Sequence, residues 1–246
     1  MSELPTATQV REALAELANP EDARNLQRFF KTAPGEYGEG DVFLGVRVPA
    51  SRHVAKRFAT LPLEQIDELL DSPVHEERLT ALFVLNLRFA AASKPRTRDD
   101  SARAEMVALY LAAVRRGRVN NWDLVDASAE HIIGPWLLDK DRALLFQLAQ
   151  RDSLWERRVA LLSTFAFIKA GEASTTLELA EILLADRRDL IQKALGWMLR
   201  EVGKRVDRAV LTGFLDIHAP EMGRTALSYA TEHLAPEQRA AYRALR

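Results

Sequence analysis

The sequence contains four tryptophans, and one of them, Trp122, precedes a carboxylate at helical spacing. Asp126 follows it by four residues, so on an α-helix the two side chains would lie on one face, a turn apart. An aromatic ring attracts a cation, and a carboxylate opposes developing positive charge such as that of an oxocarbenium ion. The pair could therefore act on a cationic substrate, although an isolated Trp-x-x-x-Asp pattern more often joins a core indole to a solvated acid.

The residues before Asp126 indicate where its helix begins. Asn120 or Asn121 would serve as the N-cap, because a short polar side chain there accepts a backbone hydrogen bond. Asp123 would fall in the first turn, where its charge meets unpaired N–H groups and the positive end of the helix dipole. We therefore expect a structural role for Asp123 and assign the chemistry to Asp126.

Two further segments combine tryptophan with basic residues. In LWERRVALL, Arg157 and Arg158 directly follow Trp155, and at helical spacing only one of the two arginines can point into a given face. In QKALGWMLRE, Trp197 stands among basic and apolar residues. Taken singly, Trp197 would be a core aromatic and Arg158 part of a surface ion pair, so their interpretation depends on the elements that position them.

Those elements follow from the apolar pattern. Pro, Gly and short polar clusters divide the chain into stretches of roughly 10 to 20 residues with the i, i+3, i+4, i+7 spacing of amphipathic helices. The one extended-looking segment is VFLGVRV at 42–48. An all-α fold is therefore expected, with helices over 6–18, 20–32, 50–60, 62–71, 73–92, 100–116, 120–138, 140–151, 153–170, 173–185, 189–205, 207–217, 220–231 and 235–245.

A glycine-rich segment precedes VFLGVRV and could suggest a phosphate-binding loop. Its glycines are Gly35, Gly38 and Gly40, but no strand signal precedes them and no GK[ST] motif follows. We interpret residues 33–41 as a mobile connection and leave their role open.

The chain also repeats itself weakly. The segments HEERLTALFVLNL, WERRVALLSTFAF and LIQKALGWMLREV share charged residues, then Ala-Leu, then an apolar stripe. Arg78 and Arg158 are separated by two steps of about 40 residues, and Arg158 and Lys193 by one of about 35, as in HEAT-type helix pairs. We expect an α-solenoid forming a single domain over 1–246, whose concave face suits a long ligand such as a duplex.

Composition limits the class of protein. The 246 residues are 48% hydrophobic with a net charge of −1, as in ordinary globular proteins. The absence of cysteine excludes disulfides and thiolate zinc sites, and the five histidines form no HExxH pattern, so we expect no metal or cofactor. The beginning of the chain lacks the apolar region of a secretory signal, and no apolar run approaches the roughly 20 residues of a membrane span. We expect a cytoplasmic protein.

Net charge averages over all faces, so a chain of net charge −1 can still carry local basic clusters. Basic residues outnumber acidic ones seven to three in both 94–118 and 187–208. Each cluster alone would be an ordinary solvated helix face, but together on a concave side they would form a track for phosphates. A third cluster at 47–57 has no acidic neighbour and consists of Arg47, Arg52, Lys56 and Arg57.

Taken together, these segments resemble the HEAT-like-repeat DNA alkylation-repair glycosylases, the AlkD-like family. The matching motifs have the family's order and near-family spacing, and the helical background agrees from about residue 10 to 235. The loop PGEYGEGDV is longer than in compact members. The motifs are FLGVRVP at 43–49, NNWDLVD at 120–126, LWERRVALL at 154–162 and IQKALGWMLREV at 191–202.

The resemblance implies an enzyme that hydrolyses the N-glycosidic bond of alkylated purines, N3-methyladenine or N7-methylguanine, in duplex DNA. Carried over by position, Asp126 is the catalytic carboxylate, Trp122 and Trp197 flank the deoxyribose, and Arg158 holds a backbone phosphate. An alkylated purine already carries positive charge, so such a site needs no general acid. Two further DNA contacts are expected at basic positions, Lys193 and Arg47.

A non-catalytic HEAT-like module that binds DNA or a protein partner through the same face is the alternative. The catalytic carboxylate distinguishes a glycosylase from such a module, and Asp126 is present at its position. We expect a monomer that binds alkylated double-stranded DNA and no membrane. We also expect Trp122 and Trp197 to face each other with Asp126 between them, both rings being partly exposed.

Overall fold

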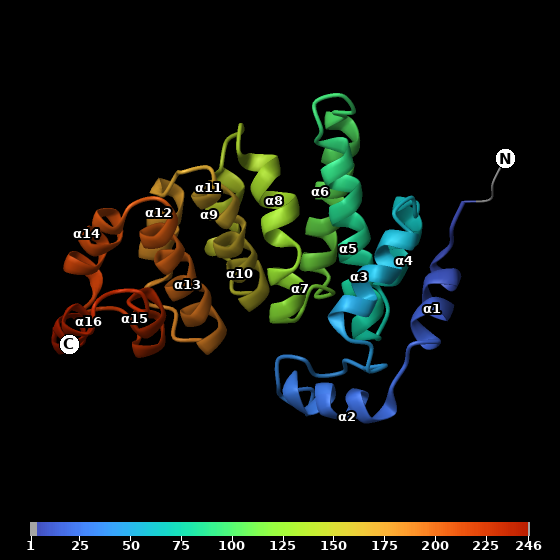
Figure 1. Cartoon of the computed structure of the whole chain (residues 1–246), viewed down its shortest axis with the longest axis horizontal. Coiled ribbons are helices and arrows are strands. Elements are labelled where there is room, and N and C mark those ends of the chain that lie inside the picture. Colours follow the sequence, from blue (N-terminus) through green and yellow to red (C-terminus); the bar gives the residue numbers. More distant parts are fainter. Residues whose placement is uncertain (1–3, 246) are drawn as a thin grey trace. The chain divides into compact units, whose positions relative to one another are not determined.

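The computed structural model describes residues 4–245, and their regular structure is helical (Figure 1). Within this range there is no strand, only an isolated bridge between Val42 and Val74, so the all-α prediction is confirmed. None of the described helices combines the length and apolar character of a membrane span. The helices are α1 (Ala7–Ala15), α2 (Pro20–Phe29), α3 (Val48–Arg57), α4 (Leu63–Leu70), α5 (His75–Ala92), α6 (Asp100–Arg115), α7 (Trp122–Asp126), α8 (Ala129–Leu137), α9 (Ala143–Ala149), α10 (Leu154–Ser163), α11 (Phe165–Lys169), α12 (Ser174–Leu183), α13 (Asp189–Arg205), α14 (Arg208–His218), α15 (Arg224–Ala230) and α16 (Pro236–Ala244).

Two of the predicted helices are each broken in two. The helix expected at 120–138 is interrupted between α7 and α8, where Ser128 Oγ donates to the Leu124 carbonyl at 2.5 Å. The helix expected at 153–170 is interrupted at Thr164, whose hydroxyl donates to the Leu161 carbonyl at 2.7 Å. Such side-chain bonds compete with the helical backbone bonds of the same turn, which explains why the apolar pattern alone did not reveal the breaks.

The chain divides into two compact units, with the boundary between Ile132 and Ile133 inside α8. In the first unit α5 is the central helix and packs against α1, α3, α4, α6 and α7. Its first eleven residues are all buried, including the polar ones at its start. One of these buried polar residues, His75, matters for the site because it contacts Asp123 of α7.

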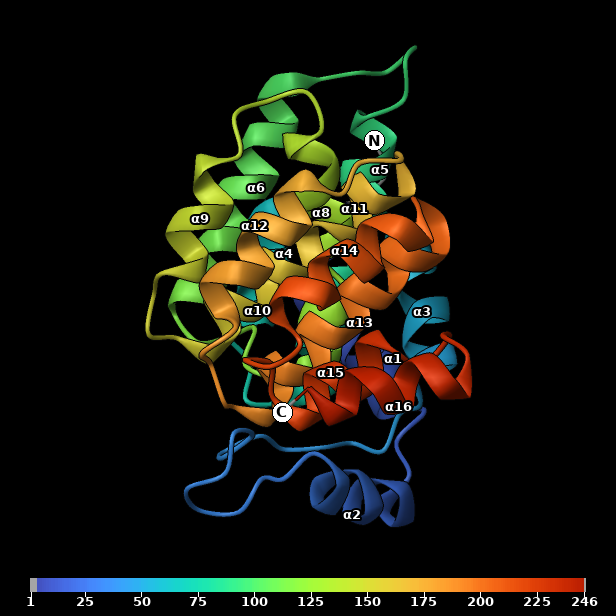
Figure 2. The same cartoon turned by 90° about the vertical axis from the view of Figure 1, so that its left-hand side faces the viewer.

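In the second unit α13 is the central helix and packs against α10, α11, α12, α14 and α15. Figure 2 shows α15 directly beneath α13. The two backbones approach closely at Gly196, where a Cβ atom would lie 2.4 Å from the Ala226 carbonyl oxygen. Glycine is therefore required there. Helix pairs stacked in this way are the building block of an α-solenoid.

The structure also gives the register of the repeats. The fourth residues of α5, α10 and α13 are Arg78, Arg157 and Gln192, and each side chain donates to the carbonyl six residues earlier. The predicted alignment of Arg78 with Arg158 and Lys193 is therefore wrong by one residue. Two consecutive arginines in α10 made either alignment compatible with the apolar stripe. The accepting carbonyls belong to Ser72, Arg151 and Asp186.

Candidate active site

Helix α7 carries both residues of the Trp-x-x-x-Asp pattern. Asn121 is its N-cap and its side chain accepts the Trp122 N–H at 2.8 Å, so one of the two predicted caps is confirmed. Trp122 is the first residue of the helix and Asp126 the last, and both side chains are half-buried. A ring and a carboxylate thus lie one turn apart, each with part of its surface open.

The negative charge of Asp126 reaches into the core of the first unit. Burial raises the pKa of the Tyr110 hydroxyl, and the charge of Asp126 raises it further, although a hydrogen bond with Ser128 opposes this. Tyr110 is fully buried and remains neutral. The residues just after α7 are therefore hydrogen-bonded to a neutral, buried tyrosine through Ser128.

Asp123 has the structural role that its position predicts. Its Oδ1 accepts the N–H of Leu124 at 2.8 Å, in the first turn of α7. Its Oδ2 lies 2.8 Å from Nε2 of His75, the first residue of α5. The carboxylate thus connects α7 to the central helix of the unit.

A buried polar network continues from His75 to the end of the glycine-rich loop. His75 Nδ1 lies 3.0 Å from Oδ2 of Asp41, and Arg78 Nη2 lies 2.6 Å from the same oxygen. Asn120 donates to Asp41 at 3.2 Å and accepts from Arg78 at 3.1 Å. Burial lowers the pKa of His75, but Asp123 and Asp41 outweigh it and raise that pKa to about 9. Sequence reasoning missed this network, because HEER was read only as part of a repeat.

Aromatic residues from α2 and its neighbourhood cover one side of α7. Phe30 stacks on Trp122 with ring centroids 5.4 Å apart, and also on Phe43 at 5.2 Å. Phe29 meets the same indole edge-on at 6.1 Å, although its own side chain is largely exposed. Trp122 therefore has one face against aromatic rings.

The motif FLGVRVP has a specific local structure. The buried carboxylate of Glu76 accepts the N–H groups of Leu44, Gly45 and Val46 at 2.8 to 3.1 Å. Gly45 has a φ of 83°, and a Cβ there would lie 2.0 Å from the Asn19 carbonyl oxygen. A side chain is thus excluded, and the segment is held in one conformation beside the His75 network.

The predicted DNA contacts differ in exposure. The Arg47 side chain is 74% exposed and pairs with Asp22 at 2.7 Å. Lys193 is 41% exposed and pairs with Asp189 at 2.8 Å. Arg158 is only 4% exposed, and its Nη1 donates to the Leu190 carbonyl. Much of its guanidinium therefore lies inside the second unit.

Trp197 belongs to the second unit and is half-buried, as Trp122 is in the first. Its ring centroid lies 6.0 Å from that of Phe165. Phe165 in turn has the cations of Lys169 and Arg205 over its ring, at 4.5 and 5.2 Å from the centroid. The surroundings of Trp197 are therefore aromatic and cationic.

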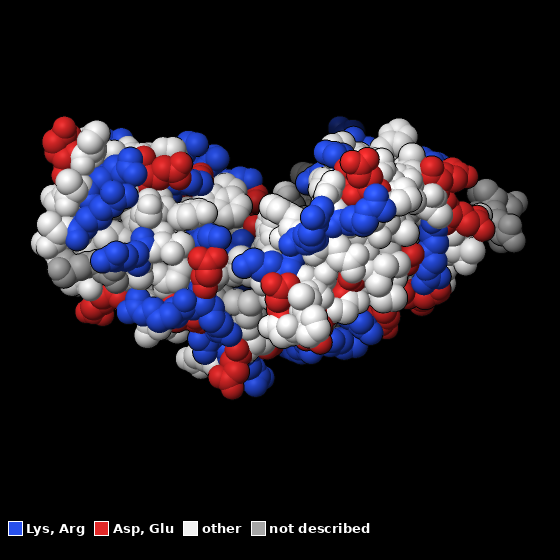
Figure 3. All heavy atoms as spheres, turned by 90° about the horizontal axis from the view of Figure 1, so that it is seen from below, with Lys and Arg blue, Asp and Glu red and all other residues white. Residues whose placement is uncertain are grey.

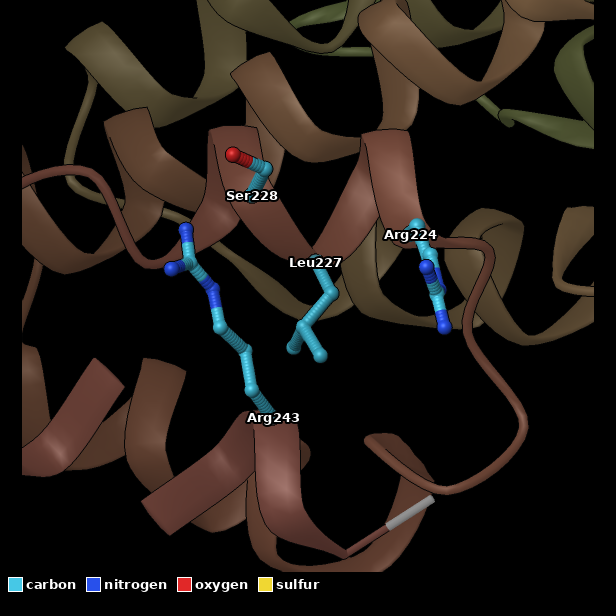
Figure 4. Close-up of a pocket in the computed structure, with 4 residues that line it drawn as sticks. All are labelled: Arg224, Leu227, Ser228 and Arg243. Atoms are coloured by element: carbon cyan, nitrogen blue, oxygen red, sulfur yellow. The ribbon is translucent and has the colours of Figure 1, made fainter. Parts of the chain in front are cut away.

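The basic clusters are neutralised to different degrees. In the 94–118 cluster, Arg116 pairs with Asp67 and Asp71 of the α4 region. In the second unit, Arg224 and Arg243 form no ion pair with another described residue and flank a pocket of about 450 Å³ (Figure 4). Figure 3 shows several groups of basic side chains over this C-terminal unit. This face of the unit therefore exposes several positive charges.

Stacked helix pairs with a half-buried Trp and Asp on one short helix define a helical-repeat protein with a candidate active site. The chain belongs to the DNA alkylation repair enzyme family, whose model matches residues 10–234. A solved structure described as a predicted DNA alkylation repair enzyme from Enterococcus faecalis is similar, with a TM-score of 0.65 and 18% identity over 89% of this chain and 97% of that one. A comparison with curated proteins gives no match.

Proposed function

We propose that the protein is a DNA glycosylase that releases cationic alkylated purines, such as N3-methyladenine and N7-methylguanine, from duplex DNA. The observation that carries the proposal is the placement of Asp126 and Trp122 on α7, in a chain of the DNA alkylation repair family. Both side chains are half-buried, so a substrate could reach them while bulk water is partly displaced.

The chemistry requires little from the protein beyond charge and orientation. The glycosidic bond breaks, and its electron pair leaves with the purine and neutralises the positive charge of the base. Asp126 stabilises the oxocarbenium ion that forms on the sugar, and Trp122 offers its electron-rich ring to the same cation. Water then adds to C1′ and loses a proton to the carboxylate, which later returns it to solvent.

The remaining residues of the proposal come from both units. Trp197 would contact the deoxyribose, as Trp122 does. Lys193 and Arg47 would exchange their carboxylate partners for DNA phosphates, since both side chains are exposed. Arg158 would contact a phosphate only through the small exposed part of its guanidinium. Such exchanges allow DNA binding by a protein whose net charge is −1.

The test is release of free base from methylated duplex DNA by the wild type and by Asp126→Asn. The amide keeps the shape and removes the charge, so excision should fall by orders of magnitude, about 100-fold or more, while DNA binding stays nearly intact. Glu105→Gln is the matched control, because it removes one exposed negative charge from α6 of the same unit. Equal single-turnover rates for wild type and Asp126→Asn would show that this acid is not catalytic.

We also propose that the protein acts as a cytoplasmic monomer and that its two units work as one domain. The absence of cysteine fits a reducing compartment. Light scattering of the free protein and of its complex with a duplex tests the monomer. Tight DNA binding without base release would instead favour a non-catalytic DNA-binding module.

A further inference from the structure

His75 is buried between two carboxylates that come from different parts of the first unit. Asp41 lies at the end of the loop before α3, and Asp123 lies in α7. They approach opposite nitrogens of the ring, at 3.0 Å for Nδ1 and 2.8 Å for Nε2. The side chain of His75 is 2% exposed, so water cannot substitute for either partner.

This geometry requires a ring that carries a proton on both nitrogens. A neutral imidazole has one N–H, so one of the two carboxylate oxygens would then face a ring lone pair at hydrogen-bond distance. An imidazolium donates to both carboxylates. Two carboxylates, His75 and Arg78 then form a neutral buried cluster, whereas loss of the imidazolium proton leaves a net negative charge in the core.

Among the residues that the structure describes, no other cation lies beside the ring that could replace it. Arg78, on its own helix, is committed to Asp41, the Ser72 carbonyl and Asn120. The other elements packed on the ring present aromatic faces, with Phe43 at 4.6 Å and Phe30 at 5.1 Å between centroids. The charge that holds Asp123 is therefore that of His75.

Asp123 links this cluster directly to the proposed catalytic residues. Its neighbour in the chain is Trp122, and its other oxygen holds the N–H of Leu124, so it anchors the first turn of α7. Phe30, whose ring is tilted against that of His75, also stacks on Trp122. A change at the ring would therefore reach the indole through both the backbone and the aromatic contact.

We propose that His75, as an imidazolium held between Asp41 and Asp123, is a positioning residue that sets the orientation of α7 and so of Trp122 and Asp126. The inference rests on the proposed function, since it assigns the orientation of the same catalytic helix. It also assigns a structural role to the loop at 33–41, because Asp41 at its end contacts His75.

The protonation state is tested directly by NMR of protein labelled with ¹⁵N in its histidine rings. Both nitrogens of His75 should be protonated at pH 7, with a transition to one neutral tautomer near pH 9. The single-turnover rate of base release and the NMR signal of the Trp122 indole N–H should change with the same midpoint. A neutral tautomer at pH 7, or a rate that does not change through the midpoint, overturns the proposal.

The variant test is His75→Gln, assayed below its own melting temperature. The amide can donate to one carboxylate but carries no charge, so the single-turnover rate should fall about 10- to 100-fold, as expected for a misplaced catalytic group, with the duplex Kd unchanged. His53→Gln, at an exposed position on α3, is the matched control and should keep the wild-type rate. A folded His75→Gln variant with the wild-type rate overturns the proposal.

Failure of the proposed function is distinguishable from failure of this inference. If the wild type releases no alkylated base, the glycosylase assignment fails, while the NMR signals of His75 and of the Trp122 indole N–H still show whether the ring sets the orientation of α7. If the wild type is active and insensitive to His75, only the positioning role is lost. If His75→Gln does not fold, the wild-type pH profile remains decisive.

Discussion

Each unit contains a buried carboxylate that joins several segments, but the cations around the two carboxylates differ. In the first unit Asp41 is held by His75 and Arg78, whose side chains are both 2% exposed. In the second unit Asp186 is held by Arg157 and Arg188, which are 23% and 37% exposed. The first cluster can lose a proton and cannot reach water, whereas the second keeps its charge and can rehydrate.

The difference in solvent exposure between the two clusters matches the elements that each one holds in place. The Asp41 cluster lies under α7, where orientation of a reacting group matters within fractions of an ångström. The Asp186 cluster joins α10 to the loop before α13, and both of its arginines are partly exposed. A buried cluster therefore lies next to the proposed catalytic helix, whereas the partly solvated cluster joins two elements of the second unit.

The largest expected effect is on stability, and it compares the two carboxylates directly. Asp41→Asn leaves the buried Arg78 without its charge partner and His75 with one of its two, so the free energy of unfolding should fall by about 3 to 5 kcal/mol. Asp186→Asn should cost less, about 1.5 to 3 kcal/mol, because its arginines reach solvent. Urea denaturation of both variants measures this, and equal losses would break the comparison.

The second expected effect is an opposite pH dependence of the two clusters. The pKa of His75 is raised from 6.5 to about 9, so its contribution is complete below pH 6.5 and is lost as the pH rises through 9. The shift corresponds to about 3 kcal/mol. Burial raises the pKa of Asp186, but Arg188 and Arg157 lower it to about 2, so its contribution is present above pH 4 and lost as the pH falls through 2.

Chemical denaturation between pH 2 and pH 10 resolves these two limbs. His75→Gln should remove the alkaline limb and leave the acid one, and Asp186→Asn should weaken the acid limb alone. An alkaline limb that persists in His75→Gln would assign it to another group. If the wild type shows no alkaline limb, His75 is not held as an imidazolium.

The helices were predictable because their cause is local. Apolar spacing, proline and glycine determined where most of them begin and end, and α7 carries Trp122 and Asp126 one turn apart, as the spacing predicts. The breaks at Ser128 and Thr164 were missed because one hydroxyl each decides them. The contacts of His75 join residues 34 and 48 positions away, which no helical period encodes.

The third effect separates a role of the indoles in chemistry from a role in packing. Trp122→Ala and Trp197→Ala should slow base release about tenfold or more if the rings act on the sugar. If the rings act as core residues, each substitution should instead lower the free energy of unfolding by about 3 to 5 kcal/mol. Each ring is half-buried, so we expect the loss in rate to exceed the loss in stability. Parallel measurements of the single-turnover rate and the melting temperature decide between these roles.

The smallest expected effect concerns the phosphate contacts, and it depends on how much charge each residue presents. Lys193→Gln removes an exposed cation, so binding to damaged and undamaged duplex should weaken equally and the slope of log K against log salt should flatten by about one unit.

Arg158 exposes only 4% of its surface, and its bond to the Leu190 carbonyl holds the start of α13. Arg158→Gln keeps a donor for that carbonyl while removing the charge, so any change in slope reports a phosphate contact and not a loosened helix. A flattening by about one unit, with an unchanged melting temperature, would place the exposed edge of Arg158 on DNA. An unchanged slope would place Arg158 off the interface and leave it a structural link between α10 and α13.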